Sequence, residues 1–294
     1  MLYGVPLLPR TMLEDQERAV EIISTGVADL ANRGARAVGL GALCAVVGSR
    51  GRAIADQSEV AVTTGHELTA WAAVRTVDRV CRLLDRDVDA PIAVLGAPWV
   101  VAVAAAEALA RRGRRVLVAI QGKGGALARI AKRSPGMELL GQDEALARAR
   151  LVVSASSGGG VLAEGALAKG TVLIDVARPR DLTGARTRSD VLSVDGETIS
   201  LPAGAQLGGI TTIYNWVVGQ GAADVFACFA APMLASLGDL ASPMSTSRFP
   251  EPDEIEAWGA AAEHRGFHVD NLYDRGKRLD PEVLRRWGSD YPAR

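Results

Sequence analysis

Apolar and polar positions follow two different periods along the chain, and the middle of the sequence shows the most regular pattern. Short apolar runs, which are typical of buried strands, alternate there with stretches that have helical spacing. The predicted strands span residues 92–95, 115–120, 151–155 and 172–176, and the predicted helices span residues 99–112, 125–133, 143–148 and 160–167. This alternation predicts a parallel sheet with helices on both faces.

The first third of the chain predicts a smaller α/β unit. Residues 13–33 place apolar side chains on one helical face and end at Gly34, a residue type that helix C-termini favour. Residues 35–48 predict a short strand followed by a glycine-rich turn. Residues 60–84 start as a strand, turn at residues 63–65 and continue as an amphipathic helix.

The segment that follows the predicted sheet returns to helices. Residues 191–202 first predict a β-hairpin with Asp195 and Gly196 in its turn. Residues 216–237 then predict a long helical run. Residues 251–267 predict a helix, because they begin with acidic residues and end near a glycine.

These patterns divide the chain into three parts. The polar stretch at residues 85–91 ends in proline and is the expected linker. Residues 1–88 form a substrate-binding α/β domain, residues 89–206 form a Rossmann-like domain, and residues 207–294 return to the first domain and carry Cys228. The predicted fold class is therefore α/β, with a Rossmann-like parallel sheet domain and a smaller α/β domain that C-terminal helices complete.

Composition places the chain among globular proteins. Of its 294 residues, 48% are hydrophobic and 23% are charged, and the formal net charge is −1 at pH 7, so nothing marks a nucleic-acid-binding protein. Residues 91–110 are apolar enough in length to span a membrane, but Gly96, Pro98 and Glu107 interrupt them. A buried strand, a turn and a buried helix explain the same composition, so no transmembrane segment is expected. The short apolar part and early acidic residues of the N-terminus do not fit a signal peptide.

The three cysteines, Cys44, Cys81 and Cys228, are far apart in the sequence and form no CxxC pair. This spacing speaks against a disulfide framework and against a structural zinc site, and no bound metal is expected. Unpaired thiols fit the reducing cytoplasm, which is the predicted location.

Cys228 lies within an apolar run of small residues, at residues 224–234. Thioester chemistry needs a thiol that a substrate can reach and that is sheltered from bulk water, because the thiolate is the nucleophile. A buried cysteine in a helix core is the alternative, and residue type alone favours it, since free cysteine is among the most buried residues. The run of residues alone leaves both interpretations open.

A threonine–threonine–glycine turn at residues 63–65 precedes the amphipathic helix. The free N–H groups of a helix start and the hydroxyl of Thr64 offer a site for an anion or a carbonyl oxygen. An ordinary helix N-cap is the alternative interpretation.

The first strand–helix connection of the central region has the layout of a dinucleotide-binding loop. Gly96 and Ala97 follow the strand, but Trp99 stands where the backbone should approach a diphosphate. After the next strand, Gln121 and Lys123 stand in place of the acidic residue that would bind a ribose hydroxyl, and a basic residue there favours NADPH over NADH. A solvated basic helix is the alternative.

A stretch rich in serine and glycine follows the third predicted strand, at residues 154–160. Ser154, Ala155 and Ser156 would then lie at the carboxyl edge of the sheet, where ligands bind in such folds. The glycines would let the backbone approach a nicotinamide ring or a substrate. We therefore predict that these residues contact the cofactor.

Several stretches together resemble the cyanobacterial long-chain acyl-[acyl-carrier-protein] reductases, which form fatty aldehydes. The matching stretches occur in the family's order and cover nearly the whole chain; they are residues 7–13, 38–47, 62–71, 171–182, 225–234 and 255–267. The family's N-terminal region has no counterpart in this chain. The resemblance implies a shikimate-dehydrogenase-like pair of domains with the active site in the cleft between them.

The resemblance also implies a covalent mechanism, in which Cys228 matches the family's reactive cysteine. Its thiolate attacks an acyl thioester of coenzyme A or acyl carrier protein, and hydride from NADPH reduces the acyl-cysteine to an aldehyde. Backbone N–H groups near residues 63–65 or 39–42 could stabilise the oxyanion. The family has asparagine at the position of His66 and histidine at that of Leu68, so His66 is either a general acid/base or a solvent-facing residue of the first helical turn.

Three functions remain open at this point. The first is an NADPH-dependent, aldehyde-forming acyl-thioester reductase that acts through Cys228. The second keeps the thiol without the hydride, as an acyltransferase or thioesterase, and the third is a non-catalytic paralogue that binds a ligand in the cleft. Trp99 favours the second and third, whereas Cys228 and Lys123 favour the first. The expected partner is an acyl-CoA or acyl-carrier thioester, and a homo-oligomer is one of the states that the sequence allows.

Overall fold

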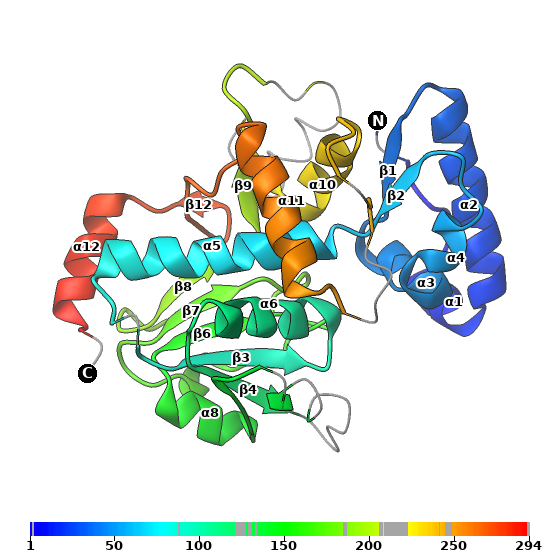
Figure 1. The fold of residues 1–294 in the computed structure, drawn as a ribbon. Helices are drawn as coiled ribbons and strands as arrows, with labels where there is room; N and C mark the ends of the chain where they lie inside the picture. The colour runs from blue at the N-terminus through cyan, green and yellow to red at the C-terminus, as the bar shows by residue number, and fades with distance from the viewer. Residues whose placement is uncertain are drawn as a thin grey trace.

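The centre of the molecule is a six-stranded parallel sheet (Figure 1). The computed structural model describes residues 1, 3–87, 89–120, 128, 131–132, 134–184, 187–205, 208, 223–240, 242–244 and 249–292. The strands are β3 (Ile92–Ala97), β4 (Val116–Ile120), β5 (Met137–Leu140), β6 (Leu151–Ser154), β7 (Val172–Asp175) and β8 (Leu192–Asp195). Their spatial order is β5-β4-β3-β6-β7-β8, and every neighbouring pair is parallel. The direction of winding therefore reverses between β3 and β6, as in doubly wound dinucleotide-binding folds.

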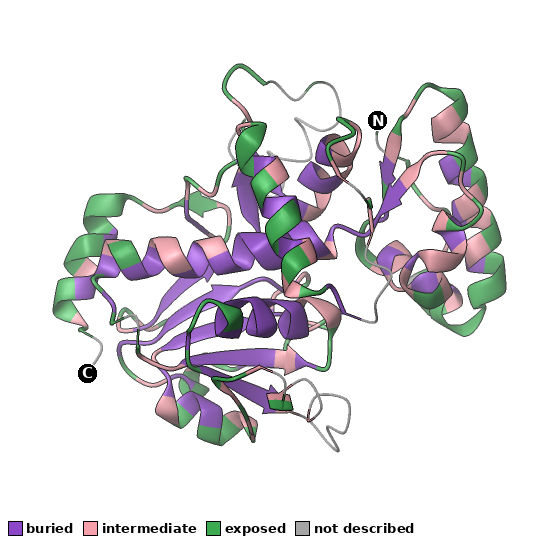
Figure 2. Ribbon diagram, in the orientation of Figure 1, coloured by how far each residue is buried: buried purple, intermediate pink, exposed green. Residues whose placement is uncertain are grey.

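Helices cover both faces of this sheet. α5 (His66–Leu84) and α6 (Val100–Arg111) pack over one face, and α8 (Gln142–Arg148) packs over the other. The inner surfaces of these helices and the strands themselves are buried (Figure 2). Strands that are apolar on both faces are expected for such a three-layer arrangement.

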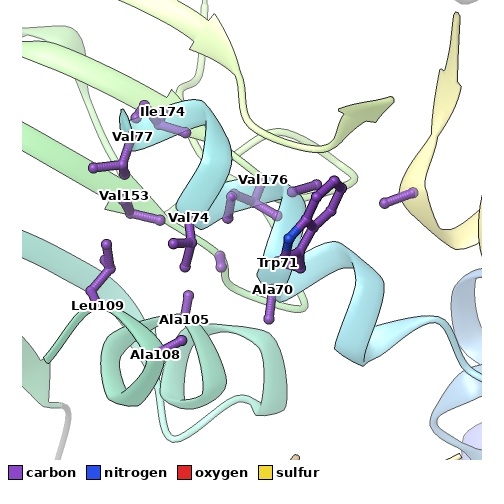
Figure 3. Close-up of a cluster of buried hydrophobic side chains, with 14 of the residues drawn as sticks. Ala70, Trp71, Val74, Val77, Ala105, Ala108, Leu109, Val153, Ile174 and Val176 are labelled. Carbon is purple, nitrogen blue, oxygen red and sulfur yellow. The ribbon is translucent and has the colours of Figure 1, made fainter. Parts of the chain in front are cut away.

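The packing of α5 on α6 and on the sheet forms the largest core. α6 is mostly alanine and valine, so its backbone can approach α5 closely. Figure 3 shows side chains from the two helices and from β6 and β7 meeting in this core; they include Ala70, Trp71, Val74, Val77, Ala105, Ala108, Leu109, Val153, Ile174 and Val176.

A smaller unit precedes the sheet and is drawn in blue in Figure 1. Its elements are α1 (Pro9–Glu14), α2 (Gln16–Asn32), β1 (Ala37–Gly39), the 3₁₀ helix η1 (Ala42–Ala45), α3 (Val47–Arg50), α4 (Arg52–Ala55) and β2 (Ala61–Thr63). β1 and β2 pair in parallel, and buried residues of α2, such as Ile23 and Val27, close a separate core over them. Helix α5 begins just after β2 and connects this unit to the sheet.

The C-terminal segment packs against both parts of the molecule. Its elements are β10 (Asp224–Phe226), α10 (Ala227–Ala235), α11 (Pro252–His264), β11 (Tyr273–Asp274), β12 (Lys277–Arg278) and α12 (Pro281–Asp290). α10 packs against β1, β2 and α5, and α11 crosses α5 (Figure 1). At that crossing Gly259 lies so close to Trp71 that an added Cβ would be 2.1 Å from the indole nitrogen.

The α/β fold class predicted from the sequence is confirmed, and all four predicted strands are present with slightly different ends. β5 escaped prediction because it is an edge strand whose residues are only partly buried. The predicted helix at residues 125–133 falls, apart from residues 128, 131 and 132, outside the described residues. No helix in the described part of the chain is long and apolar enough to cross a membrane.

The helix predicted at residues 160–167 is wrong. The structure has there only the short 3₁₀ helix η2 (Glu164–Ala166). Gly159 and Gly160 have φ values of +66° and +71°, and a Cβ on Gly159 would lie 2.6 Å from the carbonyl oxygen of Pro179. The glycine run therefore follows the neighbouring loop closely instead of starting a helix.

The predicted β-hairpin at residues 191–202 is also wrong. The turn after β8 exists, but β9 (Thr198–Ser200) pairs antiparallel with β10 and not with β8. The N–H of Gly196 donates to the carbonyl of Asp175, which holds the turn against β7 and directs β9 away from the sheet. For the same reason part of the long helix predicted at residues 216–237 is strand β10, so that Cys228 lies at the start of a helix.

Candidate active site at the start of helix α10

Cys228 is the second residue of α10 and is half-buried. Among the described residues no side chain caps this helix, and the N–H groups of Cys228 and Phe229 act on the thiol, because a helix N-terminus favours a thiolate. Burial and the carboxylate of Glu197 act in the opposite direction and raise the pKa of Cys228 to about 12. The N–H groups of Cys228 and Phe229 and the charge of Arg178 oppose that rise. The thiol is therefore protonated at neutral pH and needs a base before it can attack.

The start of α5 meets the start of α10 at Gly65. Gly65 has φ +71°, and a Cβ added to it would lie 2.8 Å from Cα of Cys228. Its N–H donates to Oγ1 of Thr63 at 3.0 Å, and its carbonyl accepts from the N–H of Thr69 at 2.9 Å. Two helix N-termini thus converge on Cys228, and their N–H groups could hold the negative oxygen of a tetrahedral intermediate.

Thr64 and His66, which were predicted as catalytic residues, are part of this junction. Oγ1 of Thr64 and Nδ1 of His66 are 2.9 Å apart. Burial, and then the charge of Arg50, lower the pKa of His66 to about 4, so its imidazole is neutral at pH 7. The structure therefore brings Thr64, His66 and Cys228 into one neighbourhood, and their catalytic roles remain predictions.

An apolar cavity of about 750 Å³ opens beside Cys228. Its walls come from the N-terminal residues, α2, β1, η1 and α10, and its only charged lining residue within the described part of the chain is Arg36. Cys44 lines the cavity together with Cys228, and burial raises the pKa of the Cys44 thiol. This volume lies within the range of small-molecule sites in proteins, and its lining suits an apolar chain.

A buried charged cluster lies at the carboxyl ends of β7 and β8. Arg178 forms an ion pair with Glu197, with Nε and Oε1 3.0 Å apart, and Arg180 forms one with Asp195. Asp195 is also 3.5 Å from Nη2 of Arg178, and both acidic side chains are almost fully buried. The guanidinium of Arg178 lies 5.0 Å from the ring centre of Phe226, the residue that precedes α10. This cluster therefore adjoins Cys228 from the side of the sheet.

The sequence prediction missed Glu197 and Arg178. The sequence pattern predicts Glu197 within a hairpin, and the stretch that resembles the reductases gives Arg178 no role. The available signal was their position, since both follow strands of the parallel sheet at the edge where ligands bind.

The predicted cofactor residues gather at the carboxyl ends of the neighbouring strands β3 and β6, the position that the ligand-binding crevice has in doubly wound folds. Gly96 and Ala97 end β3, and Ser154 ends β6, with Ala155 and Ser156 in the following loop. The N–H of Ala155 donates to the carbonyl of Leu95 at 3.2 Å, which joins the two loops. Gln121 and Lys123, which were predicted to bind the same cofactor, lie outside the described residues.

The side chains and glycine at this crevice have structural partners of their own. Gly96 has φ +99°, and a Cβ on it would lie 2.6 Å from the carbonyl carbon of Ala155, so the backbone contact alone explains the glycine. Ser154 donates to Asp181 at 2.6 Å, and Ser156 donates to it through both its N–H and its hydroxyl. These two serines therefore brace the loop on a buried carboxylate.

The crevice nevertheless fits a dinucleotide in two respects. It lies where the strand order reverses, which is the binding position in such folds. Helix α6 starts there without a side-chain cap among the described residues, so its first N–H groups could donate hydrogen bonds to a diphosphate. Trp99, the residue before α6, is 48% exposed.

Comparisons with known proteins give distant similarities. No protein-family model matches the chain. The aminotransferase PigE of Serratia sp. (strain ATCC 39006) is 29% identical over 285 residues, and the match covers 94% of this chain but only 33% of PigE.

Solved structures show weaker similarities. The malic enzyme of Entamoeba histolytica aligns with a TM-score of 0.45 and 13% identity, covering 94% of this chain and 57% of that chain. The glutamyl-tRNA reductase of Methanopyrus kandleri aligns with a TM-score of 0.33 and 27% identity, covering 42% of this chain and 34% of that chain. The description of the fold rests on the strand order, and not on these alignments.

Proposed function

We propose that the chain is an oxidoreductase that reduces an acyl thioester to an aldehyde with a nicotinamide cofactor, through an acyl group carried on Cys228. The observation that carries the proposal is the position of this thiol. It stands at the start of α10, against the start of α5, and lines an apolar cavity of about 750 Å³. A nucleophile, N–H donors for an oxyanion and a sheltered place for an acyl chain thus adjoin one another.

The residues of this chain have three tasks in the reaction. The cavity beside Cys228 holds the acyl chain and excludes water from the thioester that forms on the thiol. The N–H groups at the starts of α5 and α10 hold the carbonyl oxygen when it becomes negative. The crevice between β3 and β6, with the start of α6, would hold NADPH, which supplies the hydride. We propose NADPH and not NADH because Lys123 follows β4 in the sequence, and a basic residue after that strand suits the 2′-phosphate of NADPH.

The similarity to PigE supports an aldehyde as the product. Aminotransferases pass an amino group to a carbonyl carbon. A unit that forms an aldehyde would therefore supply a substrate of the kind that an aminotransferase uses. The chain covers 94% of its own length in that match, which includes the segment of Cys228.

A second candidate function keeps the thiol and omits the hydride. It is favoured because the residues predicted to bind the cofactor have structural partners instead: Gly96 packs against Ala155, and Asp181 binds Ser154 and Ser156. On this alternative the chain is an acyltransferase or thioesterase. The acyl adduct is common to both functions, and nucleotide binding separates them.

The test starts with intact-mass measurement after incubation with acyl-CoA of several chain lengths. We expect one acyl adduct that Cys228→Ala abolishes and that Cys44→Ala retains, since Cys44 lines the same cavity and is the matched control. Absence of an adduct with every coenzyme A and acyl-carrier donor would refute both thiol functions.

The second measurement addresses the nucleotide. We expect NADPH to be oxidised in the presence of acyl-CoA and to change the fluorescence of Trp99, which Trp99→Phe would remove from the signal. Cys228→Ala should bind NADPH as the unchanged protein does, without oxidising it. An adduct without any binding of NADPH or NADH would select the transferase or thioesterase.

A further inference from the structure

Glu197 stands directly beside the first turn of α10. Its carbonyl accepts the N–H of Ala227, the residue before Cys228, at 2.8 Å. The pairing of β9 with β10 sets this position, since Thr198 is opposite Phe226 in the antiparallel register. Glu197 and Cys228 therefore come from distant parts of the sequence but share one small antiparallel element.

The side chain of Glu197 is 6% exposed. Its Oε1 is 3.0 Å from Nε of Arg178, yet this oxygen accepts no hydrogen bond from the described residues. A buried carboxyl oxygen without a hydrogen bond is costly to keep and usually has a use. Sγ of Cys228 forms no hydrogen bond with this oxygen in the described structure, so a proton would pass between them through a small side-chain movement or one intervening water.

The charges that face Glu197 come from the ends of β7 and β8 and from the loop that follows β7. Burial raises the pKa of Glu197 to about 7, the carboxylates of Asp195 and Asp175 add to this rise, and Arg178 and Arg180 oppose it. The ionised Glu197 in turn raises the pKa of the Cys228 thiol, so the two groups compete for one proton. A carboxylate that titrates near the working pH is well matched to proton transfer.

We propose that Glu197 is the proton-transfer group of the Cys228 site. The inference rests on the proposed function in that Cys228 is the nucleophile. As the sulfur–carbon bond to the acyl group forms, the thiol proton passes to the Glu197 carboxylate. As the carbon–sulfur bond of the incoming thioester breaks, Glu197 returns that proton to the leaving thiolate, so that acyl transfer needs no other acid, base or oxidant.

His66 is less suited to this step. With a pKa of about 4 its imidazole is a weak base at neutral pH, and Nδ1 is already engaged with Thr64. Glu197, whose pKa burial raises to about 7, is the stronger base of the two at neutral pH. The sequence-based assignment of His66 as the acid/base is thus replaced in this proposal by Glu197.

The test is the pH dependence of Cys228 alkylation by iodoacetamide, measured by peptide mass spectrometry between pH 5 and 10. This reaction forms a sulfur–carbon bond, expels iodide and releases the thiol proton, so it needs neither thioester nor nucleotide. We expect the rate to rise through about pH 7 and then level off. Glu197→Gln should lose this rise and react at least about tenfold more slowly at pH 8, in line with the loss of a general base.

If Glu197 acts on the thiol only through its charge and takes up no proton, Glu197→Gln should change the alkylation rate in the opposite direction. Removing the negative charge of Glu197 would by itself lower the pKa of the thiol and speed alkylation. A Glu197→Gln variant that reacts as fast as the unchanged protein, or faster, at pH 8 would therefore overturn the proposal. Glu197→Asp keeps a carboxylate and should retain the rise in rate near neutral pH.

Two charge variants test the proposal independently of Glu197→Gln, should that variant not fold. Asp195→Asn removes a charge that raises the pKa of Glu197, so the rise in rate should move to lower pH, and Arg178→Met should move it to higher pH. An alkylation profile that neither variant shifts would overturn the proposal. A shifting profile without any acyl adduct would refute the acyl function alone, so the two proposals fail separately.

Discussion

The contact between Gly65 and Cys228 can be tested by one added methyl group. In Gly65→Ala the new Cβ would lie 2.8 Å from Cα of Cys228 and 3.3 Å from the Cβ atoms of Cys228 and Ala231. The positive φ of +71° costs a non-glycine residue roughly 1–2 kcal/mol, and overpacking costs roughly 1–3 kcal/mol more. We expect the free energy of unfolding to fall by roughly 2–5 kcal/mol in total.

Gly113 is the matched control for the backbone part of this cost. It has φ +79°, and no atom lies within 4 Å of a Cβ added there. Gly113→Ala therefore keeps the conformational cost without the contact. The difference between the two variants isolates the overpacking at Cys228, and it corresponds to a melting temperature roughly 2–12 °C lower for Gly65→Ala.

Calorimetric melting of both variants measures this difference, and iodoacetamide labelling locates it. A methyl group at Gly65 has to displace the start of α10, so the labelling rate of Cys228 should change in Gly65→Ala and stay constant in Gly113→Ala. Equal melting temperatures and equal labelling rates in the two variants would refute the close approach of α5 to α10.

Three further predictions concern the crevice, the cavity and the histidine. Gly96→Ala places a Cβ 2.6 Å from the carbonyl carbon of Ala155, so it should lower the melting temperature of the protein without bound nucleotide. An unchanged melting temperature would contradict the structural explanation of this glycine. Gly26→Val narrows the cavity beside the ring of Tyr3, so long acyl-CoA should form adducts several-fold more slowly than short acyl-CoA. Tyr3→Ala widens the cavity at the same place, so it should speed adduct formation by long acyl-CoA. Equal slowing at all chain lengths would contradict the assignment of the cavity to the acyl chain. Because folding lowers the pKa of His66 from 6.5 to about 4, the unfolded chain binds more protons in that window and stability falls as the pH drops from 6.5 towards 4. His66→Asn should flatten this part of a urea-unfolding profile, and identical profiles would contradict the burial of the imidazole.

The parallel sheet could be predicted from the sequence because its strands are apolar on both faces. β3, β6 and β7 are such runs, and the helices between them have their own period. Prediction failed at Gly159, which follows the loop at Pro179, and at the turn containing Gly196, which is held against β7. A local pattern contains no information about such contacts, which explains why glycine-rich stretches misled the assignment of both a helix and a hairpin.

The candidate site was only partly predictable for a related physical reason. Cys228 and the turn before His66 could be nominated because a thiol and a helix start carry recognisable chemistry in their own sequence. Glu197 carries no such mark, since its importance depends on burial and on the hydrogen bond from Ala227 that pairs two distant strands. A carboxylate becomes a base for the thiol only through that tertiary arrangement.

The site also divides its tasks among different contacts. The thiol and Glu197 are joined through β9, β10 and the start of α10, so the proton-transfer pair belongs to one local element. The cavity and the second set of N–H donors come instead from the smaller unit and from the start of α5, which reach Cys228 by packing. Proton transfer and acyl binding therefore depend on separate interactions. A variant such as Gly26→Val should change the choice of acyl chain while leaving the pH profile of alkylation intact, and Asp195→Asn should do the reverse.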